Sequence, residues 1–190
     1  RSGERLGIYC LETGSAMRAY NVVYDRAHSS ISTATADEFN FDEIFADADW
    51  FHFTGITPAV SDAAIELTEA ALKAAKAHGV TVSVDLNFRK KLWSSEKAQK
   101  VMTNLMQYVD VCIGNEEDAE KVLGFKPGNT DVTSGELELA GYVDIFNQMA
   151  DKFGFKYIIS SLRESHSASN NDWSACIMDG QTREFYHSRK

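Results

Sequence analysis

Cysteine, basic residues and long hydrophobic runs are all scarce in this sequence of 190 residues. Its three cysteines, Cys10, Cys112 and Cys176, are odd in number and far apart, which disfavours a disulfide framework or a zinc site. We expect them to be reduced, buried side chains in a cytoplasmic protein. No apolar run approaches the ~20 residues that cross a bilayer, and the first residues, RSGERLGIYC, contain no hydrophobic signal core. No membrane association is therefore expected.

Acidic residues outnumber basic ones, since 28 Asp and Glu against 19 Lys and Arg give a formal net charge of -9. Nucleic-acid binding is not expected, because neutralising phosphates requires clustered Lys and Arg. A small anionic substrate is compatible with this balance only if a few cations gather in one cleft. The sequence also contains no Gly-x-Ser-x-Gly nucleophile, Walker-type loop or His/Cys metal pattern.

The composition that is present, 44% hydrophobic and 25% charged residues, suits one soluble globular domain or most of one. Residues 6–24 alternate around a turn signal, TGSAMR, which predicts a pair of hairpin-like strands within a lid region of about residues 1–30. Helices and strands alternate from about residue 34 to 190. The clearest helix is predicted over 61–79, with Ser61 as its N-cap and Gly79 at its end.

The remaining elements are predicted from their periodicity. They are strands at 50–53, 80–86, 109–113 and 157–160, helices at 94–109, 115–125 and 138–154, and a closing hairpin at 173–187 that turns at DGQ. Strands that alternate with helices favour a parallel sheet covered by helices on both faces.

Polar groups follow these strands at the point where each one ends. They are TGITP after 50–53, Asn87 and Arg89 after 80–86, Gly114 and Asn115 after 109–113, and Ser161 to Glu164 after 157–160. Ligands of open α/β sheets bind beyond the carboxyl ends of the strands, so these groups predict a polar crevice that contains arginine.

Each polar residue also has a structural alternative. Asp85 could cap Arg89 or a backbone amide inside the fold, and Arg89 could form a surface ion pair. Asn115 could be only the N-cap of the helix that follows it. Asp118 lies in the first turn of that helix, where the macrodipole alone favours acids. Taken by themselves, these residues indicate a soluble α/β protein with a polar cleft.

Four segments carry a family resemblance: GIYCLETG with VVYDRAHS, FHFTGITPAVS, VSVDLNFRKKLWS and GNEEDAEKVLG. Through them the chain resembles the ribokinase-like, phosphofructokinase-B type carbohydrate kinases, and within that family most closely the 2-keto-3-deoxygluconate kinases. The third segment is similar to an Asp-x-Asn-x-Arg…Leu-Trp pattern distinctive of that subgroup. The resemblance implies a three-layer α/β sandwich with a mostly parallel sheet and a small β-strand lid.

The resemblance also implies which residues would bind the sugar acid: Tyr9, Tyr24, Arg26, Ile56, Asn87 and Arg89. The tyrosines would contribute hydroxyl groups and rings, and Ile56 its backbone. Arg89 would hold the carboxylate or keto end of the sugar acid, because a guanidinium can bind a carboxylate in bidentate fashion and lysine cannot.

Further residues would serve the phosphates and the metal, again by resemblance. Asn115, Ser161 and Arg163 would lie at the nucleotide, and Asp118 would contact Mg²⁺ through water. Asp118 replaces the glutamate usual in the family, which shortens the carboxylate's stem. Arg163 replaces a glycine in a segment that usually reads Thr-Leu-Gly, so its side chain could itself contact phosphate.

The family's Gly-Ala-Gly-Asp-type motif, which supplies the aspartate base, is expected beyond Lys190, and a glycine segment that binds sugar is expected before Arg1. By resemblance, the 190 residues would be one kinase domain incomplete at both ends and inactive alone. The implied activity is phosphorylation of 2-keto-3-deoxygluconate with ATP and Mg²⁺. A neutral-sugar kinase or a non-catalytic sugar-binding module are the alternatives.

A homodimer joined through the lid strands is expected from the residues themselves, because a two-stranded ribbon is marginal in water and LGIYCLE and YNVVY carry apolar side chains on both faces. The alternative is a ribbon that folds back onto its own sheet.

Overall fold

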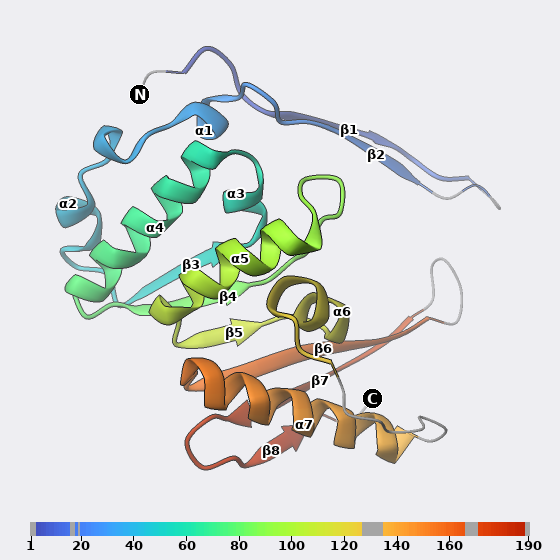
Figure 1. Cartoon of the computed structure of the whole chain (residues 1–190). Coiled ribbons are helices and arrows are strands. Elements are labelled where there is room, and N and C mark those ends of the chain that lie inside the picture. The colour runs from blue at the N-terminus through green and yellow to red at the C-terminus, as the bar shows by residue number, and fades with distance from the viewer. Residues whose placement is uncertain (1–2, 16–17, 19, 127–134, 166–170, 189–190) are drawn as a thin grey trace.

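The computed structural model describes residues 3–15, 18, 20–126, 135–165 and 171–188, without the side chains of residues 116, 135–138 and 163–165. Strands and helices alternate through most of the chain (Figure 1). In order they are β1 (Ile8–Glu12), β2 (Asn21–Asp25), α1 (Ser30–Thr33), η1 (Ala36–Glu38), α2 (Phe41–Phe45), β3 (Trp50–Thr54), α3 (Ile56–Ala59), α4 (Asp62–Ala77), β4 (Thr81–Asp85), α5 (Ser95–Leu105), η2 (Met106–Tyr108), β5 (Val111–Ile113), α6 (Glu116–Asp118), η3 (Ala119–Leu123), α7 (Gly135–Phe153), β6 (Tyr157–Ser165), β7 (Asn171–Asp179) and β8 (Phe185–His187).

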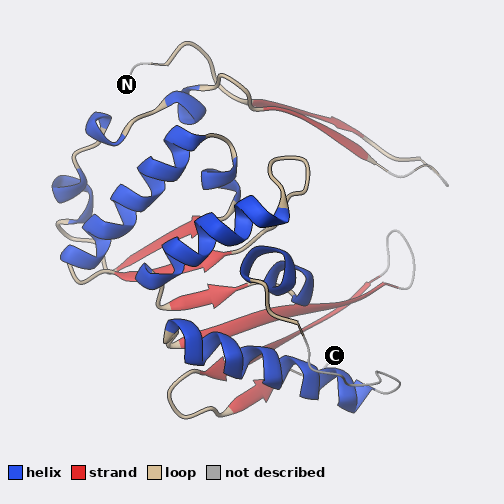
Figure 2. Cartoon of the chain, in the orientation of Figure 1, coloured by secondary structure: helices blue, strands red, loops and turns tan. Residues whose placement is uncertain are grey.

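Six strands form one sheet in the order β3-β4-β5-β6-β7-β8 (Figure 2). The pairs from β3 to β6 are parallel, and β7 and β8 extend the sheet antiparallel. The predicted α/β class and the mostly parallel sheet are therefore confirmed. Within the ranges that the structure describes, no helix has both the length and the apolar composition that a membrane span requires.

Helices α4 and α5 begin where the sequence predicts, whereas α7 begins at Gly135, three residues earlier than predicted. The Ser61 hydroxyl accepts from the backbone N–H of Ala64 at 3.0 Å and starts α4, which ends before Gly79 at a φ of 72°. Ser94 caps α5 in the same way through the N–H of Lys97. Each helix then buries one apolar face against the sheet, for example Leu72 in α4 and Met102 in α5.

The two faces of the six-stranded sheet differ. One face packs Val82, Val84, Ile158 and Met178 against α4, α5 and α7 in a single buried core. Side chains on the other face alternate with these along the strands, and its large aromatic residues remain in contact with solvent, with Trp50, Tyr157 and Tyr186 being 57%, 43% and 58% exposed. Helices were expected on both faces. In the part of the chain that the structure describes they cover one face, and we call the other the open face.

An acidic residue stabilises the end of the sheet where the parallel strands begin. Asp110, buried just before β5, accepts from the backbone N–H of Val82 at 2.9 Å. The ammonium groups of Lys76 in α4 and Lys156 before β6 lie 2.9 and 3.2 Å from its carboxylate oxygens. Burial raises the pKa of Asp110, but these hydrogen bonds and charges outweigh burial and hold the pKa below its ordinary value.

Strands β1 and β2 form a separate antiparallel pair, here called the ribbon. It leaves the N-terminal side of the molecule and extends over the edge where the parallel strands end (Figure 1). The Arg5 guanidinium fixes its base by donating to both carboxylate oxygens of Asp25 and to the carbonyl of Ala27. The predicted two-stranded lid is therefore present.

Strand β6 is longer than predicted. Residues 161–164 were expected beyond the strand end, but Ser161, Leu162 and Arg163 lie inside β6 and pair with Ala175, Ser174 and Trp173 of β7. An antiparallel partner that continues past the sheet supplies hydrogen bonds to these polar residues, so the strand does not end where its apolar run ends.

Candidate functional site

The carboxyl ends of the parallel strands lie at one level. The registers pair Thr54 with Asp85, Asp85 with Ile113, and Ile113 with Ile159. The residues that follow in each chain segment are consequently brought to one edge of the sheet. Three of the predicted site residues, Ile56, Asn87 and Asn115, share this edge, as the strand-end argument predicts.

The turn after β3 is pressed against the end of β4. The N–H of Gly55 donates to the carbonyl of Asp85 at 2.8 Å. A Cβ at position 55 would collide with the carbonyl oxygen of Leu86, so only glycine fits here. The backbone of Ile56, the proposed substrate contact, is thereby held beside the residues that follow β4.

Asn87 begins the turn after β4 with a φ of 41°, a left-handed conformation that asparagine tolerates better than most residues. Its side-chain amide donates to the Thr54 hydroxyl at 3.4 Å, and the same hydroxyl accepts from the N–H of Ile56 at 3.4 Å. Thr54 belongs to the TGITP segment at the strand end, but the sequence analysis did not include it among the predicted site residues. Only its place directly before the Gly55–Ile56 turn could have suggested this role.

Arg89 lies on the surface of this turn. Among the described residues its guanidinium donates only to the carbonyl of Phe88, at 3.4 Å. Arg89 is exposed, and the surface ion pair that was its structural alternative does not form with any described acid. The guanidinium consequently keeps most of its five donors for a ligand.

Asn115 and Asp118 cap each other at the start of α6. The Asn115 side chain accepts from the N–H of Asp118 at 2.8 Å, and Asp118 accepts from the N–H of Asn115 at 3.2 Å. The other oxygen of Asp118 accepts from the N–H of Phe88 at 2.8 Å. Asn115 is therefore an N-cap whatever else it does.

The carboxyl group of Asp118 is buried, and burial raises its pKa. The N–H groups of Phe88 and Asn115 oppose this shift, as does the charge of Arg89, while the charge of Asp85 adds to it. Among the described residues, no group of three or more His, Cys, Asp or Glu gathers as metal ligands would.

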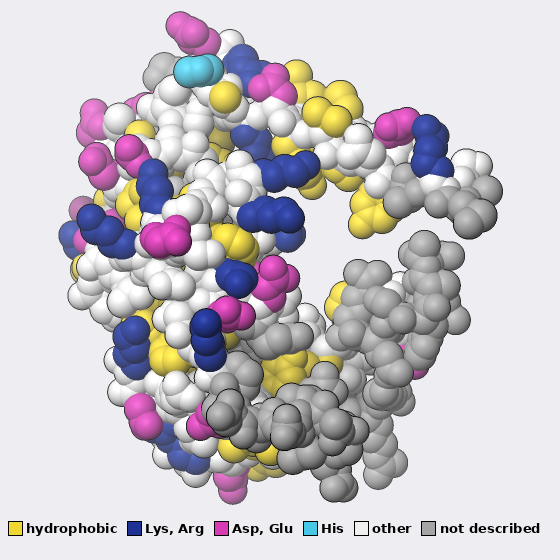
Figure 3. Space-filling view, turned by 45° about the vertical axis from the view of Figure 1, so that its right-hand side comes forward, with side chains coloured by type: hydrophobic (Ala, Val, Ile, Leu, Met, Phe, Trp, Pro, Cys, Tyr) yellow, Lys and Arg dark blue, Asp and Glu magenta, His cyan; other side chains and the backbone are white. Residues whose placement is uncertain are grey.

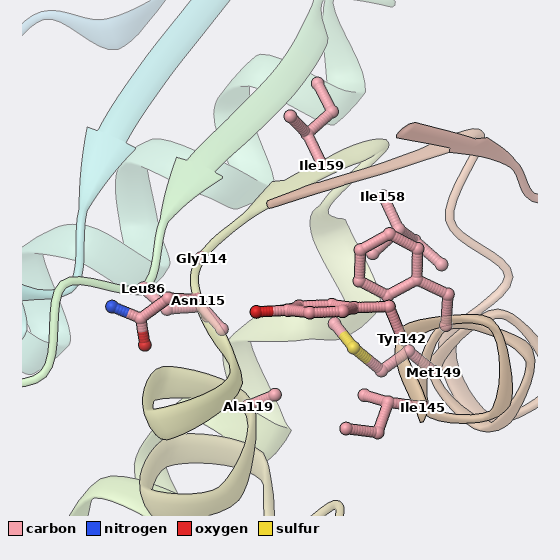
Figure 4. Close-up of a pocket in the computed structure, with 10 residues that line it drawn as sticks. Leu86, Gly114, Asn115, Ala119, Tyr142, Ile145, Met149, Ile158 and Ile159 are labelled. Carbon is pink, nitrogen blue, oxygen red and sulfur yellow. The ribbon is translucent and has the colours of Figure 1, made fainter. Parts of the chain in front are cut away.

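An apolar pocket lies behind Asn115 (Figure 4). The ring of Tyr142, in α7, crosses it with the hydroxyl end toward Asn115. The other walls are aliphatic and aromatic: Leu86, Ala119, Ile145, Phe146, Met149, Ile158 and Ile159. These side chains form a close-packed apolar support for the Asn115 loop and offer few groups to a polar ligand.

Tyr9, Tyr24 and Arg26 come together on the ribbon, apart from the strand ends. Tyr9 and Tyr24 are register partners whose ring centroids are 6.1 Å apart. The Arg26 guanidinium stacks on the Tyr24 ring at 4.1 Å from its centroid. Both tyrosines are exposed. Lys and Arg side chains gather beside the hollow beneath the ribbon, so a locally basic wall exists in an acidic protein (Figure 3).

The remaining two site residues are less fully placed. Ser161 lies in β6 with an exposed side chain. Arg163 lies two residues further along the same strand, and its side chain is outside the described residues. The structure thus brings together Ile56, Asn87, Arg89, Asn115 and Asp118, and separately the three residues of the ribbon.

Known proteins resemble this chain over most of its length. A 2-dehydro-3-deoxygalactonokinase of Haloferax volcanii is 41% identical over 140 residues, which make up 74% of this chain and 43% of that protein. The crystal structure of a 2-dehydro-3-deoxygluconokinase from Thermotoga maritima is 45% identical with a TM-score of 0.88, over 100% of this chain and 55% of that one.

A third relative, the crystal structure of a PfkB family carbohydrate kinase from Listeria grayi, is 28% identical with a TM-score of 0.80, over 99% of this chain and 54% of that one. The chain spans about half the length of these relatives. Residues 1–144 match the model of the pfkB family of carbohydrate kinases. Because of this match, and because two relatives are 41% and 45% identical to it, the chain belongs to the pfkB family of carbohydrate kinases.

Proposed function

We propose that the protein transfers a phosphoryl group from ATP to a hydroxyl group of a six-carbon keto-deoxy sugar acid, with 2-keto-3-deoxygluconate as its substrate. The observation that carries this proposal is the Arg89 guanidinium, which stands at the strand-end edge and leaves most of its donors unused by the described residues. The names of two relatives, a 2-dehydro-3-deoxygalactonokinase and a 2-dehydro-3-deoxygluconokinase, support an acidic sugar as the substrate.

The acidic end of the sugar would bind between the ribbon and the strand ends. Arg89 can hold a carboxylate through two parallel hydrogen bonds, and Arg26 supplies a second cation, oriented by its stacking on Tyr24. Tyr9 and Tyr24 offer exposed hydroxyl groups, while Ile56 and Asn87 line the turn below. Two guanidinium groups, two tyrosine hydroxyl groups and the Asn87 amide suit a small polyhydroxy acid better than a neutral apolar ligand.

The phosphate end would lie nearer Asn115, Ser161 and Arg163. Mg²⁺ with bound ATP would neutralise charge on the transferring phosphoryl group. Asp118 would contact this ion through water, because the residue is buried and each carboxylate oxygen already accepts one backbone N–H, which leaves a second lone pair for a bridging water. Oxygen donors such as Asp118 and Asn115 are the type that Mg²⁺ prefers. We assign no general base among residues 1–190.

We also propose a homodimer in which two ribbons pair about a twofold axis. An isolated two-stranded ribbon is marginally stable in water, and this one exposes Ile8, Leu11 and Val23. Exposed apolar side chains on such an element favour a partner surface. Sedimentation of the complete polypeptide with its sugar tests the proposal, and a monomer at micromolar concentration would contradict it. None of the three cysteines forms a disulfide, in keeping with the cytoplasmic location that we propose; Cys112 and Cys176 are buried as expected, whereas Cys10 lies exposed on the ribbon.

A coupled ATPase assay on the complete polypeptide tests the function. The substrates to compare are 2-keto-3-deoxygluconate, 2-keto-3-deoxygalactonate, ribose and fructose. We expect a much higher kcat/KM for the two acids than for the neutral sugars. Preference for ribose or fructose would show a neutral-sugar kinase, and sugar binding without turnover would show a non-catalytic module.

A further inference from the structure

We propose that Asp118 is a positioning residue that locks the Asn87–Arg89 turn to the Asn115 loop, so that the sugar-acid end and the phosphate end of the site form one mechanical unit. This inference rests on the proposed function for its kinetic consequence. Its structural part concerns only contacts between described residues.

The link is a single carboxylate with two backbone partners far apart in sequence. One oxygen accepts from the N–H of Phe88 at 2.8 Å, across 30 positions of sequence, and the other accepts from the N–H of Asn115 at 3.2 Å. Phe88 stands between Asn87 and Arg89, the two residues that we place at the sugar acid. Asn115 is the residue that we place at the phosphates. Asp118 therefore touches both halves of the site without lying at the surface of either.

The contact with Asp118 is the shortest side-chain hydrogen bond that the structure gives to the turn after β4. The turn's other side-chain anchor on the Asn87 side is the bond from Asn87 to Thr54, which is long at 3.4 Å. On its far side, the N–H of Leu92 donates to the carbonyl of Arg89 at 2.8 Å, which closes the turn on itself but fixes it to no neighbouring strand. Backbone pairing of Leu86 with Ile113 and the packing of Phe88 and Trp93 on the core also hold this segment, and Asp118 adds a short, charge-assisted bond from the turn itself to the adjacent strand end.

The length of the side chain matters to the link. Asp118 is buried, and its carboxylate is shared between two N–H groups that approach from different loops. A glutamate would carry the carboxylate one methylene further from the backbone, so its two oxygens would leave the positions at which they accept from Phe88 and Asn115. Asp118→Glu should therefore keep the charge but lose the paired geometry.

The test compares Asp118→Asn, Asp118→Glu and Asp118→Ala with a matched control, Glu117→Gln, which changes an exposed acid of the same helix. The first readout is the exchange rate of the Phe88 amide, measured by NMR on the ligand-free protein. We expect exchange to be about tenfold faster or more in Asp118→Ala, the scale of one hydrogen bond to a charged group. Glu117→Gln should leave the rate unchanged. Asp118→Asn keeps one oxygen acceptor and the shape of the side chain. The exchange rate of the Phe88 amide is therefore measured in this variant if Asp118→Ala does not fold.

The second readout is the KM for the sugar acid beside the KM for ATP. Loosening the Asn87–Arg89 turn should raise the sugar-acid KM by about tenfold, and Asp118→Glu should share this rise although its charge is retained. A role confined to metal and phosphate would instead change the KM for ATP and the Mg²⁺ requirement and leave the sugar-acid KM as it was; that result overturns the proposal. An unchanged Phe88 exchange rate overturns it as well. If the wild type phosphorylates no sugar acid, the proposed function fails, and the exchange rate alone decides whether the two loops are linked.

Discussion

Each end of the parallel strands carries a charged side chain, and the two differ in how many hydrogen-bond and ion-pair partners the protein supplies. Where the strands begin, the Asp110 carboxylate is surrounded by Lys76, Lys156 and the N–H of Val82. Where they end, the Arg89 guanidinium makes one long bond, to the carbonyl of Phe88, within the part of the chain that the structure describes. A charged group whose partners are all supplied by the fold contributes to stability, whereas one left with unused donors is available to a ligand. The comparison predicts that substitutions at the first end change unfolding and those at the second change binding.

The largest effect should follow from Asp110→Ala. The substitution removes the carboxylate, so the ammonium groups of Lys76 and Lys156 lose their ion-pair partner and the buried N–H of Val82 loses its acceptor. We therefore expect the free energy of unfolding to fall by about 3 kcal/mol. Urea denaturation measures it. The control is Asp42→Ala, which removes an exposed carboxylate paired with His78. That surface pair should be worth about 0.5 kcal/mol or less, and equal losses in the two variants would contradict the comparison.

The contribution of Asp110 should also depend on pH in one direction. Its pKa in the folded protein lies below the ordinary value, so the unfolded chain binds the proton more readily. The stabilisation is therefore fully present above a pH of about 4 and is lost as the pH falls through the lower, folded-state pKa. The difference in unfolding free energy between the wild type and Asp110→Ala should shrink in acid. A difference that is constant down to strongly acidic pH would exclude the ionised form as its source.

At the other end of the strands, Arg89→Lys should weaken sugar-acid binding by about 1.5–3 kcal/mol, because lysine keeps the charge but cannot form the bidentate pair. Thermal unfolding should be nearly unchanged, since Arg89 is exposed. Lys90→Ala, one residue further along the same exposed turn, is the matched control. An unchanged KM for sugar acid in Arg89→Lys would remove this residue from the site.

Asn115→Ala tests a residue with both kinds of role. Loss of the N-cap should cost about 1 kcal/mol of stability, and loss of a phosphate contact should lower kcat more than it changes the KM for the sugar acid. Asn115→Asp keeps an acceptor for the N–H of Asp118 and should recover the stability without recovering kcat. Recovery of both, or normal turnover in the alanine variant, would leave Asn115 as a helix cap alone.

Local sequence patterns were sufficient for most of the fold. Ser61, Ser94 and Gly79 mark helix ends by interactions within a few residues, and the strands from β3 to β5 follow their apolar runs. The pattern failed at β6, because its length depends on pairing with β7, a partner reached only after the chain turns back.

The candidate site shows the same limit. Polar residues at strand ends predicted where Asn87, Arg89 and Asn115 would gather, since parallel strands align their ends. The contact between Asp118 and the N–H of Phe88 joins residues 30 apart, and no local pattern carries that information. The open face was also unforeseen, because a strand buried on one side and a strand buried on both can have similar compositions.

The close approach at Gly55 restricts how this site can evolve. Any base change that replaces this glycine adds a Cβ, and that atom would strike the backbone carbonyl of Leu86, which cannot rotate aside as a side chain can. We therefore expect substitutions to be tolerated at the neighbouring Ile56, which would contact the sugar acid through its backbone and whose half-buried side chain leaves room for exchange. A codon-saturation library across the two positions, selected for growth on different sugars, should return only glycine at position 55 and several residues at position 56.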